Sequence, residues 1–193
     1  MELPISSQMT SRREWGILLL LATVQFTQAM DFVIMMPLGP QFMRVFSIGP
    51  KEFGWMISDY TFAAAVFGII GAFFIDRFER KRALLVLYAG FSVGTLLCAY
   101  APSYEFFIFA RVVAGAFAGV LTPVIFAIIG DLIPPQRRGA ANGTVMSSFA
   151  AASVAGVPIG LLLANAFSWH APFVMIVLIS VGVAILGARL LPV

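Results

Sequence analysis

Charge, cysteine and histidine are all scarce in this chain. Charged residues make up 11% of the 193 residues, and the sequence holds a single cysteine, Cys98, and a single histidine, His170. One cysteine cannot form an intrachain disulfide or a thiolate metal cluster, so we expect Cys98 to be a buried packing residue. Because the sequence also has no pair of metal ligands at helical spacing, we expect no metal, no cofactor and no enzymatic activity.

Apolar residues take the place of the missing charge. They form 61% of the chain and include 19 phenylalanines, which is outside the range of soluble globular proteins. The uninterrupted apolar runs cover residues 16–37, 53–75, 83–100, 106–129, 141–167 and 172–191. Each is long enough to cross about 30 Å of hydrocarbon as a helix, and the first is too long for a cleaved signal peptide. Continuous apolarity favours helices over alternating strands, so the sequence predicts an all-α membrane protein with six spans.

Basic residues are distributed by loop and form no single patch, so the net charge of +3 does not indicate a nucleic-acid partner. Along a six-helix zigzag, Arg44 and Lys51 fall on one side. The other side receives Arg12, Arg13, Arg77, Arg80, Lys81, Arg82, Arg137, Arg138 and Arg189. By the positive-inside rule this richer side and both termini face the cytoplasm. We expect a cytoplasmic tail over residues 1–14, a six-helix bundle over 15–193, and the longest external loop over 38–52.

Asp31, Asp59 and Arg111 are ionisable residues that share one layer in the outer half of the predicted spans. Each lies roughly 9 Å below the external end of its helix, at a rise of about 1.5 Å per residue. Charges that face lipid are costly, so we expect one carboxylate to pair with Arg111 and the other to be able to carry a proton. The alternative is a static ion-pair network that fixes helix packing. Gln25 and Gln28 extend a polar stripe on the first helix that would line a cavity.

Small residues are concentrated in the fourth and fifth predicted helices. Gly115 and Gly119 lie on the fourth, and Gly156 and Gly160 flank Pro158 on the fifth. Such residues let helix backbones approach closely in lipid, so tight packing is the simplest interpretation. A proline kink among small residues also suits a helix that rocks against its neighbour, and we predict a hinge there.

The loop after the second predicted helix resembles a family signature. Residues 76–82 read DRFERKR and are similar to the charged end of GxLaDRxGRK, a motif of the major facilitator superfamily, with Ala72 and Glu79 in the places of its glycines. The resemblance implies charge contacts that latch the inner side of the bundle, whereas the simpler interpretation is charge that sets topology. The residues assigned to this cytoplasmic gate are Asp76, Arg77, Arg80, Lys81, Asp131 and Arg138.

Further stretches extend the resemblance over nearly the whole chain. Arg111, Gly115 and Gly119 are similar to the fourth-helix pattern RxxqGxgxg of the same superfamily, and residues 131–139 are similar to the segment that closes this helix. Residues 156–160 read GVPIG and resemble the antiporter motif of the fifth helix, with one valine inserted. The order and spacing of these motifs make the resemblance specific.

Members of this superfamily have two six-helix halves with a substrate cavity between them, and this chain matches the first half. Three explanations stay open: a fragment of a longer transporter, a half-size protein that pairs with its own copy, and one half of a heterodimer. We favour a homodimer if 193 residues are the complete product, because two copies in the same orientation reproduce the arrangement by two-fold symmetry.

Asp31 followed by Pro37 also resembles the first helix of bacterial drug and sugar efflux members. The resemblance implies proton-coupled export of small organic solutes by alternating access, in a bacterial cytoplasmic membrane, with Asp31, Arg111 and Asp59 near the site. The expected partners are a small-molecule substrate, protons, the lipid bilayer and a second six-helix bundle, but no nucleic acid. The alternative is a non-transporting membrane module that binds a partner through its small-residue helix faces.

Overall fold

Helices account for almost all of residues 11–191, the part of the chain that the computed structural model describes, apart from the side chains of Ser11, Arg12 and Asp76. The α-helices are α1 (Ser11–Val33), α2 (Met35–Val45), α3 (Pro50–Ala72), α4 (Arg80–Ala99), α5 (Tyr104–Leu132), α6 (Pro135–Ala151), α7 (Val157–Ala166) and α8 (Ala171–Leu190). A short 3-10 helix, η2 (Ile75–Arg77), precedes α4, and a π-helical turn, η3 (Ala152–Gly156), joins α6 to α7.

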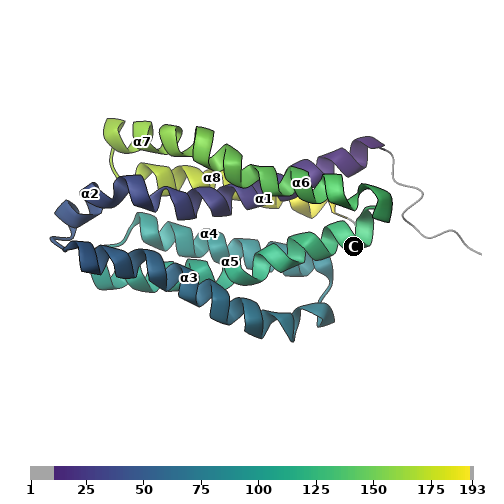
Figure 1. The fold of residues 1–193 in the computed structure, drawn as a ribbon, viewed down its shortest axis with the longest axis horizontal. Helices are drawn as coiled ribbons and strands as arrows, with labels where there is room; N and C mark the ends of the chain where they lie inside the picture. Colours follow the sequence, from purple (N-terminus) through teal and green to yellow (C-terminus); the bar gives the residue numbers. More distant parts are fainter. Residues whose placement is uncertain (1–10, 192–193) are drawn as a thin grey trace, which may run out of the picture.

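Six helical stretches are long and apolar enough to cross a membrane, which confirms the predicted all-α architecture. The fifth of them runs from Pro135 to Ala166 through the π-helical turn. The predicted tail over residues 1–14 lies mostly outside the described residues, and α1 already begins at Ser11. The start of α1 and the C-terminal end lie at the same end of the bundle (Figure 1), which we refer to as the predicted cytoplasmic end.

Residues 38–52 differ from the sequence-based expectation of a loop. Helix α2 covers most of this segment and carries Pro40 in its interior. Prolines indicated a helix end, but burial outweighs that preference, because α2 hides Leu38 and Phe42 completely. Phe42 lies 5.2 Å from Phe107 and 5.4 Å from Trp169, centroid to centroid, so an aromatic cluster holds the helix in place.

The helices form two layers (Figure 1). One layer holds α1, the pair α6 and α7, and α8, while the other holds α3, α4 and α5. Helix α5 packs against α3 and α4, α1 packs against α6 and α8, and α4 packs against α8 across the layers. Exchanging the first three spans with the last three leaves this pattern of neighbours unchanged. The bundle therefore has the internal repeat that the family resemblance implies.

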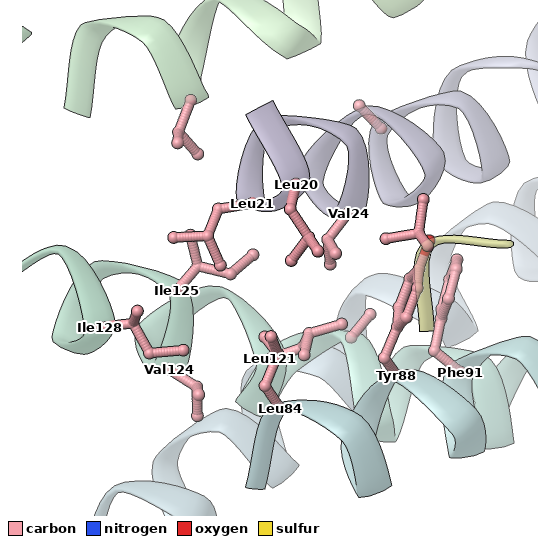
Figure 2. Close-up of a cluster of buried hydrophobic side chains, with 14 of the residues drawn as sticks. Leu20, Leu21, Val24, Leu84, Tyr88, Phe91, Leu121, Val124, Ile125 and Ile128 are labelled. Carbon is pink, nitrogen blue, oxygen red and sulfur yellow. The ribbon is translucent and has the colours of Figure 1, made fainter. Parts of the chain in front are cut away.

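An apolar core fills the space between α1, α4 and α5. Figure 2 shows side chains of all three helices converging, among them Leu21 of α1, Leu84 of α4 and Ile125 of α5, and each of these is at most 1% exposed. Contacts of this kind hold a membrane bundle together by close packing, since lipid offers the helices no hydrophobic gain on association. This core packs the three helices that carry the polar residues of the candidate site.

Two glycines set the spacing between α3 and α5. A Cβ atom added at Gly115 would overlap the carbonyl oxygen of Tyr60, and one added at Gly119 would overlap the carbonyl oxygen of Ala64. The backbones of the two helices can therefore lie in contact only because neither position has a side chain. Gly115 and Gly119 thus lie where α3 and α5 approach each other closely.

Candidate functional site

Asp31 and Arg111 meet in the interior of the bundle. The Nη1 atom of Arg111 lies 2.6 Å from Oδ2 of Asp31, and both side chains are 0% exposed. Thr95, on α4, donates from its hydroxyl to Oδ1 of Asp31 over 3.3 Å. The pairing was predicted from the cost of leaving a charge without a partner in lipid, and its geometry is as expected. The site thus joins three spans, α1, α4 and α5.

The rest of the Arg111 guanidinium lies against an aromatic ring. Its Cζ atom is 4.1 Å from the centroid of the Tyr60 ring, which is a cation–π contact. The close approach of the Tyr60 backbone to Gly115 brings α3 near enough to α5 for this contact. The Nε and Nη2 atoms of Arg111 are buried and have no hydrogen-bond partner among the described residues. Sequence reasoning missed Tyr60 because apolar residues lie on all sides of α3 and do not indicate which of its faces points inward.

Tyr60 also lines a hollow of about 210 Å³. It is lined by Gln25, Gln28, Ala29, Phe32, Tyr60, Ala64, Ala118, Gly119, Thr122 and Phe149. Gln28 donates to the carbonyl oxygen of Ala118 over 3.1 Å and accepts from the Thr122 hydroxyl over 3.5 Å. The Oε1 atom of Gln25 is buried and has no hydrogen-bond partner among the described residues. The polar stripe of α1 therefore lines a cavity, as its sequence predicted.

The ion pair does not line this hollow, in contrast to the expectation that the charges and the glutamines share one chamber. Asp31 and Arg111 are completely buried, while Tyr60, which is 6% exposed, stands at the wall of the hollow. Asp59 does not join the pair either. It is half-buried on α3, and as the neighbour of Tyr60 in the chain it points about 100° away around the helix.

The residues assigned to the cytoplasmic gate take up different contacts at the predicted cytoplasmic end. The Nε atom of Arg80 lies 3.0 Å from Oδ2 of Asp131, which ties the start of α4 to the end of α5. Arg138 donates to the carbonyl oxygens of Gly130 and Ile133 and thus satisfies the C-terminal end of α5. It contacts backbone where a carboxylate partner was expected.

The remaining members of the predicted gate contribute less to this arrangement. Arg77 is exposed, with its Cζ 5.6 Å from the centroid of the Phe74 ring. Lys81 lines a hollow of about 220 Å³ beside Arg80 and Asp131. The side chain of Asp76 lies outside the described residues, so its assignment to the gate stays a prediction.

A second ion pair at this end was not foreseen from the sequence. The Nη1 atom of Arg137 lies 2.8 Å from Oε2 of Glu14, whose side chain is 7% exposed, and the pair links α1 to α6. Glu14 had been assigned to a polar tail and Arg137 to topology alone. The signal that could have found the pair is an acidic residue followed directly by a span-length apolar run.

The predicted hinge in the fifth span coincides with irregular backbone. The π-helical turn η3 ends at Gly156, and Pro158 follows in the first turn of α7. Gly156 and Gly160 pack against Met30 and Ile34 of the first span. A π-turn beside a proline leaves some main-chain hydrogen bonds weakened or absent, which marks a place where a helix bends. Whether the helix moves there stays a prediction.

The residue types that could suggest enzyme chemistry have structural roles. Cys98 is buried, as expected, and His170 stacks on Trp169 and bonds the carbonyl oxygen of Ala99 through Nδ1. Residues 90–94 match the pattern GxSxG, but they lie inside α4, where the Ser92 hydroxyl donates to the carbonyl oxygen of Tyr88. A nucleophilic serine of that motif requires a strand-to-helix turn. No group of metal-ligating residues occurs within the described part of the chain.

Residues 21–193 match the family model described as Major Facilitator Superfamily. This chain belongs to the major facilitator superfamily. The superfamily consists of membrane transporters and not of enzymes, so the chain is an integral membrane protein of a transporter family. The motifs on the second, fourth and fifth spans therefore indicated the family correctly.

Two bacterial relatives from this superfamily illustrate the match. The chain is 34% identical to the uncharacterized MFS-type transporter YceJ of Bacillus subtilis over 88% of this chain and 43% of that protein. It is 30% identical to the multidrug efflux pump LfrA of Mycolicibacterium smegmatis over 97% of this chain and 37% of that protein. The chain spans less than half the length of both relatives and corresponds roughly to the N-terminal half of the family fold.

Solved structures agree with this assignment at the level of the fold. A bacterial homologue of the human lysosomal transporter Spinster, inward-facing and unoccupied, superposes with a TM-score of 0.79 and 19% identity over 95% of this chain and 44% of that one. The proton:xylose symporter XylE superposes with a TM-score of 0.84 and 13% identity, over 94% of this chain and 45% of that one. Both comparisons place the six helices of this chain in the same arrangement as in these transporters.

Proposed function

We propose that this chain forms one six-helix half of a proton-coupled exporter of small organic solutes that works by alternating access. The observation that carries the proposal is the buried Asp31–Arg111 pair, whose guanidinium contacts Tyr60 in the wall of a hollow lined by Gln25 and Gln28. Buried ionisable groups are expensive in a membrane and mark transport pathways by default. The name of LfrA, a multidrug efflux pump, supports export as the direction.

The hollow suits lipophilic or amphiphilic solutes. Its wall is mostly apolar, with the rings of Phe32, Tyr60 and Phe149, and it offers a few amide and hydroxyl groups. Cavities of this composition bind drug-sized molecules by apolar contact and orient them with a small number of polar groups. Gln25 is one of these polar groups, and its buried Oε1 atom has no hydrogen-bond partner among the described residues.

Proton coupling follows from the electrostatics of the pair. Protonation of Asp31 removes the charge that compensates Arg111, and a buried guanidinium without a counter-charge is strongly destabilising. The protonated state therefore favours a conformation in which Arg111 gains water or another partner, which biases the equilibrium between the two access states. Asp59, half-buried on α3, is a second candidate for protonation.

A translocation path requires a second six-helix bundle facing the hollow, because a lone bundle would leave Gln25 and Gln28 beside lipid. A second copy of this chain, related by a two-fold axis along the membrane normal, would supply it. Phe149→Cys tests this, since Phe149 is 50% exposed at the hollow and a symmetric partner would bring two copies close enough to crosslink. Leu178→Cys, on the exposed face of α8, is the control. If neither variant crosslinks, the second bundle is not a copy of this chain.

Transport itself is tested in proteoliposomes with an imposed pH gradient and ethidium, a fluorescent lipophilic cation, as solute. Asp31→Asn keeps a carbonyl oxygen for Arg111 and removes the titratable group. We expect it to abolish gradient-driven ethidium flux, while Glu105→Gln, an exposed acidic residue at the start of α5, leaves the flux unchanged. Equal fluxes in the wild type and Asp31→Asn would refute the role of Asp31.

The alternative function, a non-transporting module that binds a partner through small-residue helix faces, has less support. Gly115 and Gly119 pack against α3, and Gly160 packs against Ile34, so these faces are occupied within the bundle.

A further inference from the structure

Tyr60 contacts the ion pair and also lines the hollow. One face of the ring lies 4.1 Å from the Arg111 Cζ atom, while the same residue forms part of the wall of the hollow. Behind it, Asp31 and Arg111 are inaccessible to water. Tyr60 thus connects the wall of the hollow to the guanidinium of the ion pair.

Two ring contacts hold Tyr60 in place, one from α1 and one from α5. Phe32 contacts it from α1, with ring centroids 5.9 Å apart. A single cation–π contact is much weaker than the Asp31–Arg111 pair, so a ligand that pushes on the ring from the hollow displaces it without breaking the pair first. The backbone beneath stays fixed, because α3 and α5 lie in contact at Tyr60 and Gly115.

We propose that Tyr60 is the gate through which the hollow communicates with the Asp31–Arg111 pair. With its ring over the guanidinium, water is kept from the carboxylate, and with its ring displaced by a solute in the hollow, water and protons reach it. The inference rests on the proposed transport function and adds the residue that connects solute binding to access of the charged pair. Tyr60 acts here as a positioning residue, since it excludes water from groups that do the proton chemistry.

Cys98 provides a native reporter of this access. It follows Thr95, the hydroxyl partner of Asp31, by about one turn on the same face of α4 and is 0% exposed. A reagent that reaches the ion pair from the hollow therefore also reaches Cys98.

The test measures how fast 2-aminoethyl methanethiosulfonate modifies Cys98 in membranes, read by mass spectrometry of the peptide that carries it. Access controls the reactivity of a buried thiol, so we expect Tyr60→Ala to raise the rate by about tenfold or more over the wild type. Tyr60→Phe keeps the ring and should stay within about twofold of the wild type. Phe62→Ala is the control, because it removes a ring that is 72% exposed on the same helix. Its labelling rate should also stay within about twofold of the wild type. If Tyr60→Ala does not fold, Tyr60→Leu takes its place and should accelerate the reaction in the same direction.

Unchanged labelling in a folded Tyr60→Ala or Tyr60→Leu protein overturns the gate, and so does a Tyr60→Phe rate as high as that of Tyr60→Ala. These outcomes do not depend on any solute being moved. If the protein transports no ethidium but its Cys98 labelling depends on Tyr60, the proposed function is wrong and the gate is supported. If the protein transports ethidium but its Cys98 labelling does not depend on Tyr60, the gate is wrong and the proposed function is supported.

Discussion

Gly115 and Tyr60 lie so close together that a Cβ atom at Gly115 would be 3.1 Å from both the Cα atom and the carbonyl carbon of Tyr60 and would overlap its carbonyl oxygen. The contact joins α3 to α5 one turn away from Arg111. The spacing of two helices and the position of the ring that covers the ion pair are therefore fixed at the same point.

Gly115→Ala should destabilise the bundle, because the methyl group forces the backbones of α3 and α5 apart. We expect a loss of about 1–3 kcal/mol, the usual cost of overpacking a close-packed interior. Gly182→Ala in α8 is the matched control, since a Cβ there meets nothing within 4 Å. Its expected effect is a gain of roughly 0.5–1 kcal/mol from higher helix propensity. Thermal unfolding in detergent measures both, and equal melting temperatures would contradict the close contact.

Substituting one member of the Asp31–Arg111 pair should lower the free energy of unfolding more than substituting both. Asp31→Leu or Arg111→Leu alone leaves a buried charge uncompensated and should cost about 3–5 kcal/mol. The double variant carries no buried charge, and we expect it to be more stable than either single variant. A double-mutant cycle on unfolding free energies tests this. Strictly additive losses would show that the two side chains do not depend on each other.

Two glutamines in the hollow should respond oppositely to the same substitution. Gln28 makes hydrogen bonds to Ala118 and Thr122, so Gln28→Met should lower stability by about 1–3 kcal/mol. The Oε1 atom of Gln25 is buried without a partner, so Gln25→Met removes an unsatisfied group and should leave stability unchanged or higher. Ethidium binding should weaken in Gln25→Met despite the intact fold. Equal destabilisation by both substitutions would show that Gln25 is satisfied in the folded protein.

The spans and the central ion pair could be predicted from the sequence, because both follow from the cost of polar groups in lipid. That cost makes six apolar runs conspicuous and requires a partner for Arg111, and the structure supplies Asp31 at 2.6 Å. It does not identify which carboxylate becomes the partner. Asp59 lies at a similar predicted depth, and the choice between the two is made by the rotation of α3 about its own axis.

Features that depend on that rotation could not be predicted. Helix α3 has apolar residues on all of its sides, so its sequence does not indicate that Tyr60 faces inward and Phe62 outward. The helix α2 was also missed, because its prolines indicated a turn while its stability comes from burying Phe42 among residues distant in the sequence. In both cases tertiary packing decides what local sequence leaves open.

Glu14 and Arg137 should contribute measurable stability at the predicted cytoplasmic end, where they link the first span to the fifth. The carboxylate is nearly buried and the guanidinium is 56% exposed, so solvent screens the pair only in part. We expect Glu14→Gln to lower stability by about 1 kcal/mol, at the upper end of the range for exposed pairs. The loss should shrink in high salt, which already weakens the pair in the wild type.

The matched control is Arg82→Gln, which removes an ion pair with Glu79 whose side chains are 81% and 53% exposed. That substitution should change stability by less than about 0.5 kcal/mol, since water competes fully for both charges. Chemical unfolding at low and high salt compares the two variants. A loss in Glu14→Gln no larger than in Arg82→Gln would mean that α1 and α6 are held together by apolar packing alone. A larger, salt-dependent loss of stability in Glu14→Gln would indicate that the ion pair holds the first and fifth spans together. This contact lies on the predicted cytoplasmic side of the π-helical turn at which the fifth span is predicted to bend.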